Sequence, residues 1–244
     1  MEQSLEEILT LLQLERLEVN LFRGVSPDEV RARVFGGQVL GQALSAAYYT
    51  VETDLICHSF HSYFLRGGDP VAPIIYEVDD ARDGRSFSSR RVIAIQHGKQ
   101  IFNMAASFQK PETGREHQID MPPAPPPEEV PSEAAMREKG ADKVDEQWRD
   151  MFLRKRPFEI RPVNPTDLFE PKVMEPRQMV WFRADKAMPE DIKVNQAMLA
   201  YMSDTTLLGT CLRPHGLTYM NPKLQSASLD HAMWFYHPFK ADEW

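Results

Sequence analysis

The sequence predicts an α+β protein in which long helices pack against antiparallel β-sheets. Three observations carry this prediction. Several segments have apolar residues at helical spacing, while others alternate between two faces and are separated by turns that contain Gly. The order of these segments in the first half of the chain then recurs in the second half.

The first half begins with a short amphipathic helix, because Ser4 and Glu7 form a capping-box pattern ahead of an apolar stripe. A second helix is expected over residues 36–51, where many small residues would allow a close approach to a sheet. Strands are then expected at residues 58–65, 73–78, 86–96 and 100–109. The turns between these strands are expected at residues 67–70, 80–84 and 97–98.

The second half follows a Pro-rich segment, residues 111–131, which is predicted to be an extended linker. A helix of mixed charge, interrupted near Gly140, is expected over residues 132–152. Two strands, a long helix and a His-containing strand are then expected at residues 158–163, 178–184, 194–212 and 229–238. We therefore divide the chain into an N-terminal domain, a linker with a connecting helix, and a C-terminal domain, at residues 1–110, 111–157 and 158–244.

The second half ends sooner than the first. After its His-containing strand the first half supplies about three more strands, whereas the second half stops at Trp244. The second long helix would then lack half of its sheet, and each large apolar side chain left in water costs roughly 1.5–3 kcal/mol. We therefore expect the second unit to be truncated at its C-terminus by about three strands.

The composition excludes several classes of function. A formal net charge of -8 over 244 residues argues against nucleic-acid binding, which needs a basic surface. No apolar run approaches the roughly 20 residues of a membrane span, so no membrane insertion is expected. The first residues also lack the pattern of a secretory signal. Cys57 and Cys211 lack metal-ligand spacing and are expected to be buried free thiols in a reducing, cytoplasmic compartment.

Asp204 is the strongest candidate for a chemical role. It lies three residues after Tyr201 and four before Leu208, so on a continuous helix it would occupy an otherwise apolar face. A carboxylate in such surroundings is suited to act as a general base near neutral pH. The alternative is that Asp204 caps a new helical turn that begins at Thr205.

Ser228 and three histidines are weaker candidates. Ser228 lacks the glycines that surround a nucleophilic serine, so it is either an ordinary strand residue or a hydroxyl that orients a water molecule. His58 and His61 are expected on opposite faces of a strand, where they cannot readily share a metal ion. We expect these two and His231 to be core or interface histidines, with an accessory role near the site open to His58.

Five segments together resemble the acyl-CoA thioesterase II family, the double hot-dog thioesterases of bacteria and peroxisomes. They are VFGGQVLGQA at 34–43, HSFHSYFL at 58–65, DGRSFSSRR at 83–91, AYMSD at 200–204 and LDHAMWF at 229–235. The resemblance covers nearly all of the chain and is loose only around the linker. It implies two hot-dog domains, each with a long helix wrapped by an antiparallel sheet.

The resemblance also implies a reaction and a site. Members of the family hydrolyse fatty-acyl-CoA to a free fatty acid and CoA, without a metal or an organic cofactor. Their water molecule is held by an Asp, a Thr or Ser, and a Gln, which map onto Asp204, Ser228 and a residue beyond Trp244. The family also leads us to expect a homo-oligomer, either a dimer or a tetramer, in the cytoplasm of a bacterium or the peroxisome of a eukaryote.

Two further features allow more than one interpretation. Arg85, Arg90 and Arg91 form the densest basic cluster of the first half, and they would either meet the phosphates of CoA or remain solvated. Gly36 and Gly37 precede a helix, where an anion could bind, although tight packing is the expected role. At the level of function, a hot-dog hydratase or dehydratase with a His/Asp pair and a non-catalytic acyl-CoA binding module remain the alternatives.

Overall fold

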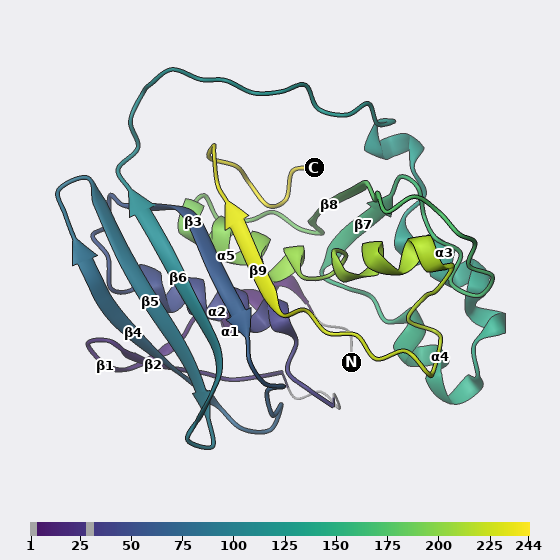
Figure 1. The fold of residues 1–244 in the computed structure, drawn as a ribbon, viewed down its shortest axis with the longest axis horizontal. Helices are drawn as coiled ribbons and strands as arrows, with labels where there is room; N and C mark the ends of the chain where they lie inside the picture. Colours follow the sequence, from purple (N-terminus) through teal and green to yellow (C-terminus); the bar gives the residue numbers. More distant parts are fainter. Residues whose placement is uncertain (1–3, 28–31) are drawn as a thin grey trace.

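The structure is a computed structural model that describes residues 4–27 and 32–244. Its main feature is a seven-stranded antiparallel sheet that curves around a long helix, α2 (Gly36–Tyr48), as Figure 1 shows. In spatial order the strands are β1 (Glu15–Glu18), β2 (Leu21–Gly24), β4 (Ile74–Asp83), β5 (Phe87–Gln96), β6 (Lys99–Gln109), β3 (Ile56–Phe64) and β9 (Asp230–Trp234). The expected α+β class, with a helix wrapped by an antiparallel sheet, is confirmed.

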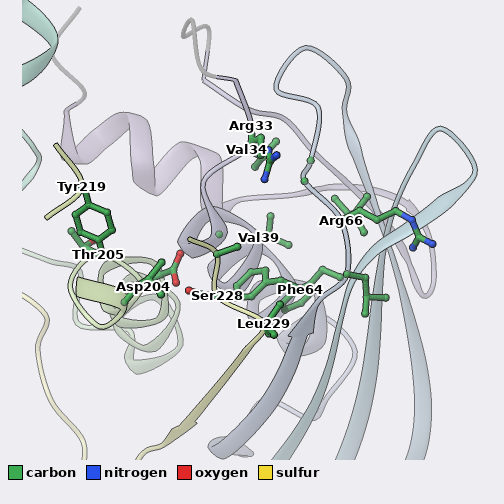
Figure 2. A pocket seen from close by; sticks show the side chains of 18 residues that line it. Arg33, Val34, Val39, Phe64, Arg66, Asp204, Thr205, Tyr219, Ser228 and Leu229 are labelled. Carbon is green, nitrogen blue, oxygen red and sulfur yellow. The ribbon is translucent and has the colours of Figure 1, made fainter. Parts of the chain in front are cut away.

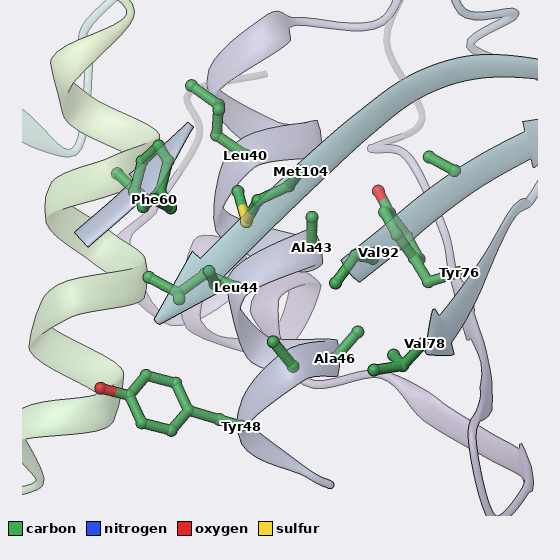
Figure 3. Close-up of a cluster of buried hydrophobic side chains, with 14 of the residues drawn as sticks. Leu40, Ala43, Leu44, Ala46, Tyr48, Phe60, Tyr76, Val78, Val92 and Met104 are labelled. Carbon is green, nitrogen blue, oxygen red and sulfur yellow. The ribbon is translucent and has the colours of Figure 1, made fainter. Parts of the chain in front are cut away.

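Helix α2 is buried over almost its whole length. Leu40, Ala43 and Leu44 are fully enclosed, and Figure 3 shows them among side chains of the sheet such as Val92 and Met104. The alternation of small and large residues lets the helix lie close to the strands while still burying large apolar side chains, each worth roughly 1.5–3 kcal/mol. This cluster is the main core of the protein.

The β4–β5 hairpin corrects one predicted turn. We expected the chain to reverse over residues 80–84, but β4 continues to Asp83, with an irregularity in its pairing between Asp79 and Arg82. The reversal follows at Gly84, whose N–H donates to the carbonyl of Phe87. The irregularity lets polar residues continue a strand in a place where composition alone suggests a turn.

The β5–β6 hairpin confirms another predicted turn. His97 and Gly98 both have positive φ angles, of 49° and 69°. Such angles suit the two central residues of a tight hairpin turn, because its twist matches that of the flanking strands.

A second helix pairs with α2. Helix α5 (Ile192–Ser203) crosses it where Gly37 and Gly41 leave no side chain between the two backbones. A Cβ atom on Gly41 would lie 2.9 Å from the carbonyl oxygen of Ala197. The expected role of the first glycines of α2 in tight packing is confirmed for Gly37, which faces the carbonyl of Tyr201, but its partner is a helix rather than a sheet.

The remaining elements form a second core around α5. Helix α1 (Leu5–Leu12) begins with the predicted capping box at Ser4. The interrupted helix becomes α3 (Glu133–Gly140) and α4 (Glu146–Leu153), and β7 (Phe158–Pro162) pairs with β8 (Val180–Ala184) in a separate two-stranded sheet. Apolar side chains of α1, α5, β7 and β8 bury one another. Figure 1 places α3, α4, β7 and β8 on the same side of the molecule, away from β1 and β2.

The end of α5 differs from the prediction. A continuous helix was expected over residues 194–212, but α5 stops at Ser203 and a 3-10 segment, Leu208–His215, follows after a turn. Two β-branched residues, Thr205 and Thr206, and then Gly209 lower helix propensity at this point. Asp204 is therefore the C-cap residue of α5 rather than a member of its buried face.

Strand β9 brings the end of the chain back to the first half. It pairs antiparallel with β3, with Ser62 opposite His231, so that one sheet contains strands from both halves. Figure 1 shows β9 beside β3, at the edge of the large sheet. The division of the chain at residues 110 and 157 stays a prediction.

The two cysteines differ in burial. Both cysteines are free, as expected, but only Cys57 is buried, and burial raises the pKa of its thiol to about 12. Cys211 is exposed, which corrects the expectation that both thiols are enclosed. Within the described residues, no helix combines the length and the apolar character needed to cross a lipid bilayer.

Candidate active site

A cavity of about 490 Å³ lies where the start of α2, the end of β3 and the end of α5 meet. Figure 2 shows its side chains, which come from both halves of the chain. Its lining is polar and apolar in equal measure, and Asp204, Thr205, Tyr219 and Ser228 lie on one side, away from Arg33 and Arg66. The lining residues are Arg33, Val34, Gly36, Val39, Phe64, Leu65, Arg66, Gly67, Gly68, Ile101, Phe102, Asp204, Thr205, Leu208, Tyr219, Ala227, Ser228 and Leu229.

Asp204 lies at the wall of this cavity, beside the first turn of α2. Its side chain is 13% exposed, and a Cβ atom on Gly36 would lie 2.5 Å from its Oδ2 atom. Only glycine therefore leaves room for the carboxylate at this point. No described side chain caps the N-terminus of α2, so the positive end of the helix dipole lies at the cavity wall, where Gly36 is a lining residue. Asp204 does not cap a new helical turn, because residues 204–207 form a turn after α5.

Ser228 lies beside the Asp204 carboxylate in the wall of the cavity. Figure 2 shows its hydroxyl and the Asp204 carboxylate turned toward one another. The segment is held in place by β3, since Phe64 donates its N–H to the carbonyl of Leu229 at 2.9 Å. The structure thus brings together the two residues that the sequence analysis singled out, although they are 24 positions apart in the chain.

His231 lies behind Asp204, and its proximity was not foreseen. Its Nδ1 atom is 3.8 Å from Oδ1 of Asp204, and its Nε2 atom is 3.0 Å from Oγ of Ser203. The side chain is 3% exposed and is not among the residues that line the cavity. It is a core histidine, as expected, but the sequence could not show what it faces without the end of α5 and the register of β9.

Comparison with known proteins decides the family. The family model described as acyl-CoA thioesterase N-terminal domain matches residues 25–109, and the model described as acyl-CoA thioesterase matches residues 147–244. The chain is 41% identical to acyl-CoA thioesterase 2 of Haemophilus influenzae, over 100% of this chain and 85% of that protein. The chain belongs to the acyl-CoA thioesterase family. The family and the enzyme class expected from the sequence are confirmed.

Other relatives and solved structures agree with this membership. Human acyl-coenzyme A thioesterase 8 is 43% identical, over 97% of this chain and 76% of that protein. The crystal structure of acyl-CoA thioesterase II TesB2 from Mycobacterium marinum is 42% identical, with a TM-score of 0.74, over 97% of this chain and 82% of the other. A hot-dog protein from Alicyclobacillus acidocaldarius has a TM-score of 0.72 at 20% identity, which supports the fold alone.

In this thioesterase the candidate His58 lies away from the cavity. Its Nε2 atom is 2.8 Å from Oγ of Ser107, and partial burial lowers its pKa. A bulge in the pairing of β3 between Cys57 and Ser59 also breaks the strict alternation that we expected between His58 and His61. Nothing in its contacts connects His58 to Asp204 or Ser228.

The three arginines of the predicted cluster do not act together in this thioesterase structure. Arg90 is 2% exposed and donates to the backbone and side chain of Thr50 and to Asp83, so it joins the end of α2 to the sheet. Its guanidinium group lowers the pKa of Asp83 and is not available to a phosphate. Arg85 and Arg91 are exposed, but neither lines the cavity.

Two other arginines of the thioesterase, Arg33 and Arg66, line the cavity instead. Arg66 is anchored by a hydrogen bond to the carbonyl of Gln100 at 2.7 Å. These residues were missed because we searched for the densest basic cluster, whereas Arg66 stands alone and Arg33 has only Arg31 as a basic neighbour in the sequence.

Tyr219 and Thr205 complete the polar part of the wall. Burial raises the pKa of Tyr219 to about 12, with smaller contributions from Cys211 and Asp204, so its phenol is neutral at physiological pH. The hydroxyl oxygen of Thr205 is buried and has no hydrogen-bond partner within residues 4–27 and 32–244. Across the same residues, no group of three His, Cys, Asp or Glu side chains is placed to hold a metal ion.

Proposed function

We propose that this chain hydrolyses fatty-acyl-CoA thioesters with a water molecule that Asp204 and Ser228 hold between them. The observation that carries the proposal is the placement of the Asp204 carboxylate and the Ser228 hydroxyl, face to face in one cavity at the start of α2. Membership of the acyl-CoA thioesterase family supports the choice of substrate.

The reaction needs one proton acceptor and one proton donor. Asp204 accepts a proton from the water molecule as its oxygen adds to the thioester carbonyl carbon, and a tetrahedral oxyanion forms. When the C–S bond breaks, the protonated Asp204 returns the proton to the departing thiolate of CoA. The products are a fatty acid and CoA, and Asp204 is ready for another water molecule.

The start of α2 supplies the complementary charge. The dipole at its N-terminus favours negative charge, so it can stabilise the oxyanion as it forms. Ser228 orients the water and is not a nucleophile in this scheme, because no described base lies in hydrogen-bond contact with its hydroxyl.

The rest of the cavity suits the two ends of the substrate. Apolar side chains such as Val39, Phe64 and Phe102 offer a surface to the acyl chain. Arg33 and Arg66 offer positive charge to the phosphates of CoA, in a protein whose formal net charge is -8. The expected assembly into homo-oligomers and the expected location, in a bacterial cytoplasm or a peroxisome, remain predictions.

The alternatives have less support. A hydratase or dehydratase needs a His/Asp pair that reaches the substrate, and His231, although next to Asp204, lies outside the cavity lining. A non-catalytic binding module would not need a carboxylate enclosed at a helix N-terminus. The Asp204 carboxylate occupies the space that a Cβ atom at position 36 would need.

The proposal is tested with Asp204→Asn, which keeps the shape of the side chain and removes the base. We expect release of CoA from palmitoyl-CoA or octanoyl-CoA to fall by a factor of roughly 10²–10⁴, while binding of the acyl-CoA is retained. Ser228→Ala should lower the rate less, since it removes only the orienting hydroxyl. CoA is quantified by chromatography, because Cys211 is exposed and would react with a thiol reagent.

Asp230→Asn is the matched control, because Asp230 is an exposed carboxylate at the start of β9. It should hydrolyse at the rate of the unaltered protein. Hydrolysis at an undiminished rate in Asp204→Asn would remove Asp204 from the mechanism. Binding without any release of CoA by the unaltered chain would instead favour a binding module, and hydration of an enoyl-CoA would favour a hydratase.

A further inference from the structure

We propose that Val39 and Phe102 close the enclosed part of the cavity and set the length of the fatty-acyl chain that the enzyme accepts. This inference rests on the proposed function, because it takes the reacting thioester to lie beside Asp204 and Ser228. It is carried by the burial of the apolar lining residues and by their place relative to that reaction point.

Two parts of the cavity lining differ in their contact with water. Arg33 and Arg66 are exposed, whereas the apolar residues Val39, Ile101 and Phe102 are each no more than 5% exposed. The phosphates of CoA need water or a cation, while an acyl chain gains most where its apolar surface leaves water. The acyl chain therefore belongs in the enclosed part of the cavity, and the nucleotide of CoA belongs at the exposed arginines.

Phe64 connects the reaction point to this enclosed part. A Cβ atom on Gly36 would lie 3.1 Å from two carbon atoms of the Phe64 ring and 2.5 Å from Oδ2 of Asp204, so the ring and the carboxylate both border Gly36. The Phe64 ring also packs against Phe102 of the neighbouring strand, with 5.3 Å between ring centroids. A continuous apolar surface therefore leads from the surroundings of the carboxylate to Phe102.

Val39 lines the same space from the side of the helix. It follows Gly36 by three residues, so the two lie on one face of α2, and both line the cavity. Val39 and Phe102 belong to one cluster of core residues, which joins α2 to the sheet. An acyl chain that starts beside Gly36 and runs along α2 therefore meets Val39 within one helical turn.

The cavity stops at Val39 and Phe102. The next residue on the same face of α2 is Ala43, and the next on the same face of β6 is Met104. Both are at most 2% exposed and do not line the cavity, and Figure 3 shows them among the side chains of the main core. A close-packed core has no room for further CH2 groups. The side chains at positions 39 and 102 therefore limit how long a chain can be enclosed.

The test measures kcat/KM for the release of CoA from a series of saturated acyl-CoAs, from butyryl-CoA to palmitoyl-CoA, each below the concentration at which it forms micelles. In the unaltered protein, kcat/KM should rise about 4-fold for each CH2 group that enters the cavity, as burial of a CH2 group allows. The rise should stop at the chain length that reaches Val39 and Phe102. This length limit is the quantity to compare between variants.

Phe102→Ala and Val39→Leu should move the length limit in opposite directions. Phe102→Ala removes the ring that closes the cavity, so the limit should move to longer chains, and two further enclosed CH2 groups would raise kcat/KM for those chains roughly 16-fold. Val39→Leu adds a CH2 group to the cavity wall, so the limit should move to shorter chains, with butyryl-CoA little affected. A general loss of stability would lower the rates for all chain lengths and would not produce opposite shifts.

Phe108→Ala is the matched control. Phe108 is an equally enclosed ring on the same face of β6, but it packs against Tyr48 and does not line the cavity. Phe108→Ala should keep the length limit of the unaltered protein, even where its stability falls. Phe102→Leu and Phe108→Leu repeat the comparison with smaller changes if circular dichroism shows that an alanine variant is unfolded.

The outcomes separate this inference from the proposed function. An absence of CoA release from every acyl-CoA would overturn the proposed function, and the inference with it. Release with one and the same length limit in the unaltered protein, Phe102→Ala and Val39→Leu would overturn only the roles of Val39 and Phe102. Opposite shifts in these two variants, with no shift in Phe108→Ala, would support the inference.

Discussion

At the scale of single residues, the position of a charge matters more than the density of charges. Arg33 and Arg66 line the cavity, whereas Arg91 is exposed on a strand of the sheet and does not reach it. Arg90, next in sequence, is occupied by Thr50 and Asp83. The candidate phosphate contacts are therefore Arg33, which precedes α2, and Arg66, which follows β3.

Replacing these arginines should weaken binding more than chemistry. We expect Arg33→Ala or Arg66→Ala to raise KM for an acyl-CoA about 10-fold, which corresponds to about 1.4 kcal/mol, with kcat little changed. Steady-state kinetics at low and high salt checks this, because phosphate contacts weaken as salt rises. Arg91→Ala is the matched control, and a larger rise of KM in that variant than in the other two would return the phosphate site to the predicted cluster.

Part of the candidate site could be predicted from the sequence, residue by residue. Asp204 and Ser228 were identified because a carboxylate in an apolar pattern and a family motif are both visible along the chain. His231 was visible too, but its relation to Asp204 depends on α5 ending at Ser203 and on the register between β9 and β3. Such relations arise from pairing between distant segments, and no local pattern records them.

At the scale of elements, two glycines decide how α2 meets α5. Gly37 and Gly41 are four residues apart, so they lie on the same face of α2, and both turn toward backbone carbonyls of α5. The close approach of the helices positions Asp204, at the end of α5, against Gly36, at the start of α2. The spacing of the two helices is thus tied directly to the geometry of the cavity.

Filling this contact should loosen both the fold and the site. Ala is the better helix former by roughly 1 kcal/mol, yet in Gly41→Ala the new Cβ atom would lie 2.9 Å from the carbonyl oxygen of Ala197 and 2.5 Å from Leu12. We expect the free energy of unfolding to fall by about 1–3 kcal/mol, which is the usual cost of overpacking. Urea unfolding followed by circular dichroism measures this, and kcat should fall as the helices separate.

Gly114→Ala is the control for this prediction, because a Cβ atom at Gly114 in the linker meets nothing within 4 Å. It should unfold at the same urea concentration as the unaltered protein. An unchanged or greater stability of Gly41→Ala would mean that the two helices can adjust their distance at no cost.

Most helices and strands of the first half could be predicted from the sequence, but some of their ends could not. Helices α1 and α2 and the strands β3 to β6 and β9 were expected near their observed positions, because their hydrophobic periods are strong, whereas the hairpin of β1 and β2 was not expected. The extension of β4 to Asp83 and the end of α5 at Ser203 were not expected. In both places polar or β-branched residues are accommodated by an irregular strand or by a cap at a cavity, where tertiary contacts override local preference.

At the scale of the whole molecule, a buried polar cluster joins the two halves. The hydroxyl of Tyr48, at the end of α2, donates to the side-chain oxygen of Gln196 in α5 and accepts the N–H of Cys57. The amide nitrogen of Gln196 donates in turn to the carbonyl of Cys57. Figure 3 shows the ring of Tyr48 extending from α2 toward α5. Three elements from both halves thus share one set of hydrogen bonds.

Removing the hydroxyl should destabilise the protein as a unit. In Tyr48→Phe the groups of Cys57 and Gln196 lose a partner in the core, and each buried polar group left without one costs about 1–3 kcal/mol. All four tryptophans lie after residue 147, so their fluorescence reports mainly on the second half, although Trp234 also contacts His61 of β3, while circular dichroism reports on the whole chain. Both signals should shift together to lower urea, and separate transitions would show that the halves unfold independently.

The pairing of β9 with β3 has one more consequence. Gly36 and the start of α2 come from one half of the chain, while Asp204 and Ser228 come from the other, and the strand that follows Ser228 pairs with β3 of the first half. Neither half of the chain contains all the residues of the candidate site. We therefore expect substitutions on the two sides of the candidate site to depend on one another.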